Sequence, residues 1–228
     1  MAQGFTMISS SRLGSLGLVG ILICSGAPAR AQQFSADLVR TALSGGAPAP
    51  NGKLYVFKDK VRIETPDFPD GFFLVDGAVR SAYFVRPGAR VFMDARQSSR
   101  LNQLLVPLDL NDPCMQWQDM ATLAGGTDRR GLLRCERLRE EVIDGRGVVA
   151  YRARSSAGKE SLGWIDVSLK FPLRIQLEDG TTISVENIHE EPQPAALFEI
   201  PSAFRRFDPE VLLKRIKQSD VWVEQPTP

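Results

Sequence analysis

The side chains of this chain that could do chemistry are few, and their spacing favours structural roles. His189 is the only histidine, and Glu190 and Glu191 follow it, a combination that could move protons or bind a metal ion. If a strand continues through this stretch, His189 and Glu190 point to opposite faces, and no placed nucleophile or third ligand accompanies them. We therefore predict that His189 is structural or exposed.

Two further patterns also fail as sites. Glu140, Glu141 and Asp144 form an acidic cluster, but their spacing matches no calcium-binding loop, so a solvated turn is predicted. The glycines within 145–147 lie between strands and not at the strand-to-helix junction of a nucleotide-binding loop. We expect no metal, no cofactor and no enzymatic activity, with an acid–base pair of carboxylates as the open alternative.

The N-terminus has the pattern of an export signal. A positive charge precedes the short apolar run 16–23, and residues 29–31 match a small-x-small cleavage site. The apolar run is shorter than the roughly 20 residues that a membrane-spanning helix needs. We predict a signal peptide over 1–31, cleavage after Ala31 and a periplasmic protein, with lipid attachment at Cys24 as the alternative.

The predicted mature chain, residues 32–228, has a balanced charge. Removal of the two arginines within residues 1–31 takes the formal net charge from +1 to −1. Nucleic-acid binding needs a clustered basic surface, which this mixed charge does not provide. Because a chain of this length with no long linker buries one core, we predict a single domain.

Cys114 and Cys135 are the cysteines that remain after cleavage, and we predict a disulfide between them. An isolated pair in an oxidising compartment is typical of a structural disulfide. A redox pair would favour C-x-x-C spacing. A zinc site needs about four ligands, more than two thiols and one histidine supply.

The stretch LRIQLEDGTTISVENI, which begins at Leu173, predicts a hairpin with one apolar face. Apolar and polar residues alternate along both arms. A three-residue loop, 178–180, pairs Ile175 with Ile183 and Leu173 with Val185, so that the apolar residues share one face. We predict this loop, with its glycine in the left-handed conformation.

The other predicted strands lie on either side of a helical segment. Around 52–57 both faces are apolar, with Leu54 and Val56 on one face and Tyr55 and Phe57 on the other. This is expected where a sheet is covered on one side and curves against something on the other. Turn signals separate strands within the following ranges: 52–65, 71–85, 86–95, 132–139, 147–154 and 160–167.

Three helices are predicted. Ser35 caps the first, which runs to about Leu43. The second begins with Asp112 as its cap and Pro113 at its first position, and glycines at 125–126 end it. The third runs over about 208–217, with its apolar residues inward (Leu212, Leu213 and Ile216) and its basic residues outward (Lys214, Arg215 and Lys217).

The predicted fold class is α+β. Short hairpin connections make the sheet antiparallel, and a sheet of on the order of ten strands should curl. We therefore expect a strongly curled antiparallel sheet, a half-barrel, with short helices covering its concave face.

The C-terminal run carries a resemblance. Trp164 and Asp166 precede Pro172, a D-G turn follows, and NIHEEPQPAALFEIPSAF ends the run with Phe198 and Pro201. With this order of elements, residues 52–204 resemble the LolA/LolB-like superfamily of periplasmic lipoprotein-localisation factors. The resemblance implies an unclosed half-barrel whose concave apolar face is plugged by helices and receives acyl chains. The arginine-proline strand motif of the lipoprotein carrier is not found here, which favours a relative with another apolar ligand or a sensing role.

We therefore expect the protein to carry or bind an apolar ligand, a lipid or acyl chain, in the concavity of its sheet. Met115, Trp117 and Met120 either fill core or form a lid over the pocket. The alternative function is a periplasmic sensor or interaction module with an envelope protein partner. The candidate ligand-binding residues are Trp117, Met120, Trp164, Leu173, Ile175, Ile183 and Val185.

Overall fold

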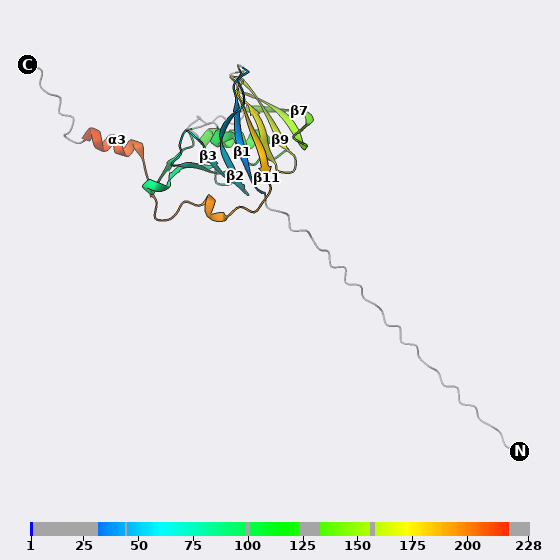
Figure 1. Ribbon diagram of the computed structural model, residues 1–228, viewed down its shortest axis with the longest axis horizontal. Coiled ribbons are helices and arrows are strands. Elements are labelled where there is room, and N and C mark those ends of the chain that lie inside the picture. Colours follow the sequence, from blue (N-terminus) through cyan, green and yellow to red (C-terminus); the bar gives the residue numbers. More distant parts are fainter. Residues whose placement is uncertain (2–31, 44, 99–100, 124–132, 156–157, 219–228) are drawn as a thin grey trace, which may run out of the picture.

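The computed structural model describes residue 1 and residues 32–43, 45–98, 101–123, 133–155 and 158–218 (Figure 1). The predicted signal peptide and Cys24 therefore lie outside the described residues. Most of the described chain is sheet, with few short helices: α1 (Leu101–Leu104), α2 (Pro113–Leu123), α3 (Pro209–Gln218) and the 3-10 turns η1 (Pro87–Ala89) and η2 (Ala195–Phe198).

Twelve strands of the described residues form one sheet in the order β12-β6-β5-β4-β3-β2-β1-β11-β10-β9-β8-β7. Neighbouring strands pair antiparallel, as predicted, except for the two-residue β12, which pairs parallel with β6. The bounds are β1 (Gln33–Thr41), β2 (Ala49–Phe57), β3 (Lys60–Glu64), β4 (Phe72–Asp76), β5 (Ser81–Arg86), β6 (Val91–Asp94), β7 (Leu133–Ile143), β8 (Arg146–Ser155), β9 (Glu160–Asp166), β10 (Phe171–Gln176), β11 (Thr182–His189) and β12 (Arg205–Arg206).

The prediction of a helix from Ser35 to about Leu43 was wrong, because this segment is the strand β1. Phe34, Ala36 and Leu38 alternate with polar residues and are all buried, which is the period of a strand. β1 lies between β2 and β11 and pairs with both. It therefore joins two meanders, β1 to β6 and β7 to β11, into one sheet.

The hairpin of β10 and β11 has the predicted register. Ile175 pairs with Ile183, and Leu177 N–H donates to Thr181 O across a three-residue loop. Gly180 has a φ of 78°, the left-handed conformation that glycine adopts without steric cost. The apolar residues of the two strands therefore share one face of the sheet.

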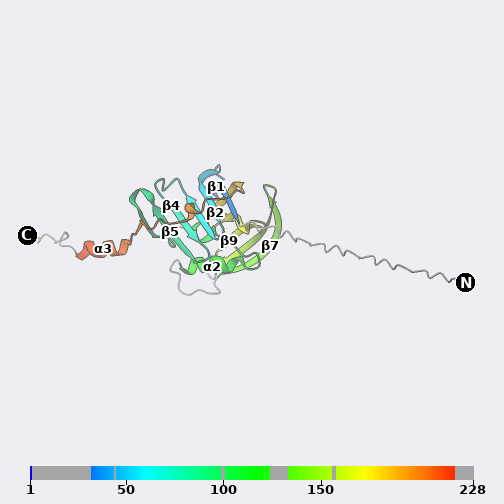
Figure 2. The same ribbon diagram turned by 90° about the horizontal axis from the view of Figure 1, so that it is seen from below.

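That face, here called the inner face, is the one that α1 and α2 cover. The chain between β6 and β7 contains both helices, and Figure 2 shows α2 against the strands near β9 and β7. Apolar side chains from both meanders form one buried cluster with those of α2; they include Phe34, Leu54, Val61, Val75, Trp117, Ile165, Phe171, Ile175 and Val185.

The outer face of β2 to β6 is covered by a strap, residues 190–204, which runs from β11 to β12. Phe198 of the strap is 2% exposed and stacks on Phe57 with 5.6 Å between ring centroids. Arg62 Nη1 donates to Leu197 O at 3.3 Å, which fixes the strap backbone over β3. The strap explains why both faces of β2 are apolar, since each face has its own cover.

α3 begins as predicted but does not bury its leucines. Asp208 Oδ1 accepts hydrogen bonds from the N–H groups of Glu210 and Val211, so it caps the helix. Leu212 and Leu213 are 44% and 57% exposed, and α3 stands apart from the sheet in Figures 1 and 2. The prediction that these two leucines point inward was therefore wrong.

Candidate ligand-binding face

The cover of the inner face is attached to the sheet from both sides. The predicted disulfide joins Cys114 of α2 to Cys135 of β7, with 5.6 Å between the Cα atoms. On the other side, Asp119 Oδ2 of α2 lies 2.9 Å from Arg80 Nη2 in the turn between β4 and β5. Tyr151 Oη of β8 donates to Leu110 O, just before α2, at 2.6 Å.

α2 itself forms at the predicted place for local reasons. Asp112 Oδ1 accepts a hydrogen bond from Met115 N–H at 3.1 Å, and Pro113 occupies the first helical position. The glycines predicted to end the helix lie outside the described residues. The cap and the disulfide together fix the start of the helix against β7.

Six of the seven candidate residues come together where α2 meets the inner face. Each is 2–4% exposed and belongs to the buried cluster of the inner face: Trp117, Met120, Leu173, Ile175, Ile183 and Val185. Met115 is half exposed and takes no part in the buried cluster. The two interpretations of α2, lid or core, therefore concern Trp117 and Met120.

Trp164 belongs to the opposite face. In the sheet, Ile175 pairs with Gly163 and Ile183, whereas Trp164 pairs with Arg174. Because successive side chains of a strand alternate between faces, Trp164 points away from the face of Ile175. Although Trp164 contacts the apolar cluster, its ring lies beside the Arg174 guanidinium, 5.9 Å from centroid to carbon. The face that Trp164 occupies follows only from the pairing of β9, β10 and β11.

Gly163 is the residue that sequence reasoning missed. A Cβ atom built on Gly163 would lie 2.7 Å from Trp117 Cη2, which is closer than real Cβ atoms come to other heavy atoms. The absent side chain is therefore what lets the indole lie directly on β9. Its position inside the predicted strand ESLGWID was the available signal, because glycine in a strand often marks a close approach.

A hollow lies beside this cover. It has a volume of about 450 Å³ and opens between the start of α2 and β7. Its lining includes both cysteines, Leu110, Gln118 and Tyr151. A second hollow of about 600 Å³ lies near the loop between β3 and β4, where Arg62 sits 3.6 Å above the Phe72 ring and pairs with Glu64.

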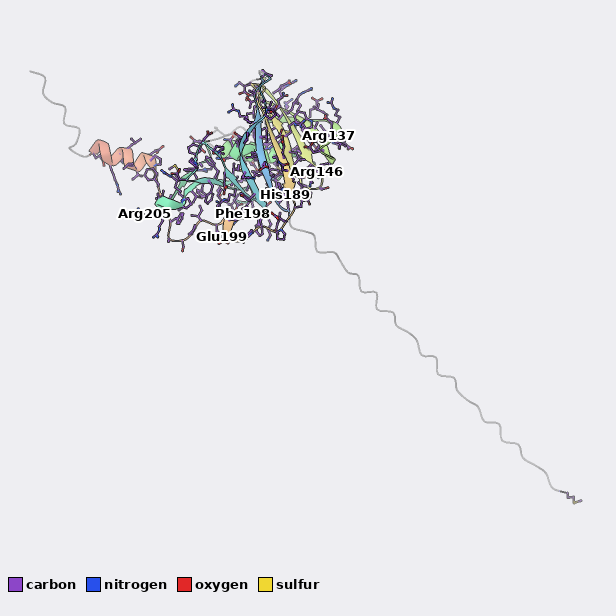
Figure 3. All side chains as sticks on the ribbon, in the orientation of Figure 1. Arg137, Arg146, His189, Phe198, Glu199 and Arg205 are labelled. Atoms are coloured by element: carbon purple, nitrogen blue, oxygen red, sulfur yellow. A yellow bond between two sulfur atoms is a disulfide. The ribbon has the colours of Figure 1, made fainter. Side chains whose placement is uncertain are left out.

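His189, Glu190 and Glu191, the residues considered for catalysis, lie at the surface, and Glu190 pairs with Arg146. Figure 3 labels His189 at the end of β11, where it is exposed, and Arg146 at the start of β8. Asp166 is buried, and its Oδ1 accepts hydrogen bonds from Ser168 and Leu169 N–H while its Oδ2 pairs with Arg146. Hydrogen bonding to Glu190 raises the pKa of Arg146 above its ordinary value.

Within the described residues, the structure contains neither a candidate metal site nor a candidate membrane-spanning helix. Among them, no three His, Cys, Asp or Glu side chains gather closely enough to hold a metal ion. None of the helices that the structure describes has the length and hydropathy to cross a membrane. The charged groups instead form surface pairs, as between Asp37 and Lys53, where the lysine hydrogen bond lowers the pKa of the carboxyl.

Comparison with known proteins gives likenesses in structure alone. No family model matches the chain, and no curated protein matches it significantly. An uncharacterized conserved protein from Thermus thermophilus has a TM-score of 0.46 at 9% identity, over 78% of this chain and 91% of that one. The LolA superfamily protein NE2245 from Nitrosomonas europaea has a TM-score of 0.33 at 14% identity, over 75% and 91%.

A third similar structure is that of MucB, with a TM-score of 0.39 at 15% identity, over 77% of this chain and 60% of that one. The superfamily that the sequence resembles is thus represented among the similar structures.

Proposed function

We propose that this protein is a periplasmic binding protein for an apolar ligand, a lipid or acyl chain, which it takes up on the inner face of its sheet beneath α2. The observation that carries the proposal is the composition of that face. Four candidate residues of β10 and β11 form one buried apolar cluster with Trp117 and Met120 of α2, a single helix of 11 residues that covers them. No catalytic step is part of this proposal.

A half-barrel shape of the sheet belongs to the same proposal, and the attachment of α2 supports it. The disulfide and the Asp119–Arg80 ion pair tie one helix to β7 and to the turn after β4. In a flat sheet these strands would lie roughly 40 Å apart, because eight strand spacings separate them. Cys114 and Asp119, in contrast, are only about 7.5 Å apart along a helix axis. A sheet that curls around α2 accounts for both contacts.

Binding of an acyl chain requires that α2 move away from the inner face. An acyl chain would displace Trp117 and Met120, which fill the inner face, and would replace their apolar contacts with its own. Each buried methylene contributes about 0.8 kcal/mol, so about a dozen would offset the cost of moving the helix and ordering the chain. The hollow beside Tyr151 and the disulfide is the proposed entrance.

A matched pair of tryptophan variants tests the proposal. Trp117→Phe removes part of the ring that fills the inner face. Because this truncation leaves apolar space for the ligand, we expect it to raise the affinity for a fluorescent fatty acid about fivefold or more. Trp164→Phe makes the same chemical change on the opposite face and should leave the affinity unaltered. Native mass spectrometry of protein taken from the periplasm should also detect bound lipid.

The outcomes separate clearly. Protein that carries no lipid from the periplasm and takes up no fatty acid, in the parent and in Trp117→Phe alike, would show that the inner face is only core. Equal effects of both tryptophan variants would place the binding site elsewhere.

The alternative is a periplasmic sensor or protein-interaction module without a ligand. The observation that favours it is the burial of the same cluster, in which Leu173 and Ile175 are each only 2% exposed. A stoichiometric protein partner recovered by pull-down, together with lipid-free protein, would favour this module over the carrier.

A further inference from the structure

The helix α3 presents apolar side chains that nothing in the described chain covers. Val211, Leu212 and Leu213 are 44–57% exposed. The helix is also well defined at its start, since β12 binds β6 immediately before it: Arg205 N–H donates to Arg90 O at 3.0 Å and Phe207 N–H to Phe92 O at 2.7 Å. α3 therefore leaves the sheet from the edge formed by β12.

Positive charge gathers on the same segment. Residues 205–218 contain five basic and two acidic side chains, a net charge of +3, whereas the whole chain nets +1. Arg205 and Arg206 are exposed just before the helix, and Figure 3 labels Arg205 at the point where α3 departs. The rest of the chain is therefore negative overall, and the segment stands out from it in both charge and apolarity.

The leucines and the basic residues of α3 lie at different positions around the helix axis. At 3.6 residues per turn, Leu212 and Leu213 lie on one side of the helix, and Val211 lies on the far side. Arg215 flanks Leu212 at about 60° around the helix, and Lys214 flanks Leu213 at about 100°. Long basic side chains on such flanks can keep their apolar stems near the leucines while their charges reach a negatively charged layer. This is the pattern of a helix that lies in the interface of an anionic bilayer.

We propose that α3 docks on an anionic lipid surface. A second copy of the chain is a poor occupant, because it would bring two segments of net charge +3 together. A standard protein interface buries roughly 800 Å² on each partner, more than three partly exposed apolar side chains provide. An anionic bilayer matches both the charge and the small apolar side formed by Leu212 and Leu213. This proposal is independent of acyl-chain binding on the inner face.

Vesicle co-sedimentation of the exported protein tests the docking. We expect binding to vesicles of equal parts phosphatidylglycerol and phosphatidylcholine, weaker binding at high salt, and little binding to phosphatidylcholine alone. Leu212→Asp combined with Leu213→Asp should lower the affinity about tenfold or more, as should Lys214→Glu combined with Arg215→Glu. Because these side chains are exposed and α3 stands apart from the sheet, the thermal melting of the variants should match that of the parent.

Two controls make the same chemical changes elsewhere. Val142→Asp alters an apolar side chain that is 72% exposed near the end of β7, and Arg137→Glu with Arg139→Glu reverses two exposed charges of that strand. Both controls should bind vesicles like the parent. Parent protein that binds no vesicles, binds both lipid compositions equally, or is affected as strongly by the β7 controls as by the α3 variants would overturn the proposal. A protein partner that occupies α3 and prevents the parent protein from sedimenting with vesicles would also overturn it.

Discussion

A methyl group added at Gly163 should disturb the packing of the Trp117 indole of α2 against β9. In general, Gly→Ala stabilises a protein by about 0.4–1 kcal/mol where the backbone conformation suits alanine, because the unfolded chain loses freedom. At Gly163 the new Cβ atom would lie 2.7 Å from Trp117 Cη2 and 3.4 Å from Cζ2. Either the strand or the indole must shift.

The magnitude follows from how firmly the indole is held. Trp117 is 4% exposed, and its Nε1 donates to Leu104 O at 3.1 Å, so a shift of the ring disturbs both the packing and that hydrogen bond. Overpacking of this kind typically costs about 1–3 kcal/mol. We therefore expect Gly163→Ala to lower the free energy of unfolding by that amount, opposite in sign to the usual effect.

Urea denaturation followed by circular dichroism measures the change. The control is Gly147→Ala in β8, where a Cβ atom would have no heavy atom within 4 Å and where a neutral or slightly stabilising effect is expected. Trp117→Phe removes the atom that clashes, so the double variant with Gly163→Ala should show a coupling of about 0.5–3 kcal/mol. Equal stability of the two glycine variants, or simple additivity in the double variant, would refute the reasoning.

Two further predictions concern the strap and the sheet surface. Phe198→Ala should lower the free energy of unfolding by about 3–5 kcal/mol, because the ring is 2% exposed between the strap and the outer face, whereas Glu199→Ala beside it should have little effect. Comparable urea midpoints for the two variants would contradict this role of the ring. Hydrogen bonds from Lys53 and Asn187 lower the pKa of Asp37 in the folded protein, so its contribution to stability is present above the unfolded value of about 3.9 and is lost as the pH falls through the folded pKa. Asp37→Asn should therefore lose less stability than the parent between neutral pH and about pH 3, and an unchanged loss in urea titrations would show that the pairing contributes nothing.

Features that depend on neighbours in sequence could be predicted from the sequence. The hairpin of β10 and β11 follows from the alternation of its arms and a glycine that adopts a left-handed turn. The start of α2 follows from Asp112 and Pro113, since a cap and a first-position proline act within one turn. The pairing of Cys114 with Cys135 could be predicted from the two cysteines that remain after the predicted cleavage.

Features that depend on distant partners were decided by the tertiary structure. Phe34 and Leu38 are spaced for a helix as well as for a strand, and the segment is a strand because β2 and β11 offer hydrogen bonds to both of its edges. Trp164 is an apolar residue beside other candidates, yet the register of β9 with β10 puts it on the opposite face. The leucines of α3 satisfy an amphipathic pattern whether or not a surface lies opposite them, because periodicity specifies which side of a helix is apolar and leaves open what meets it.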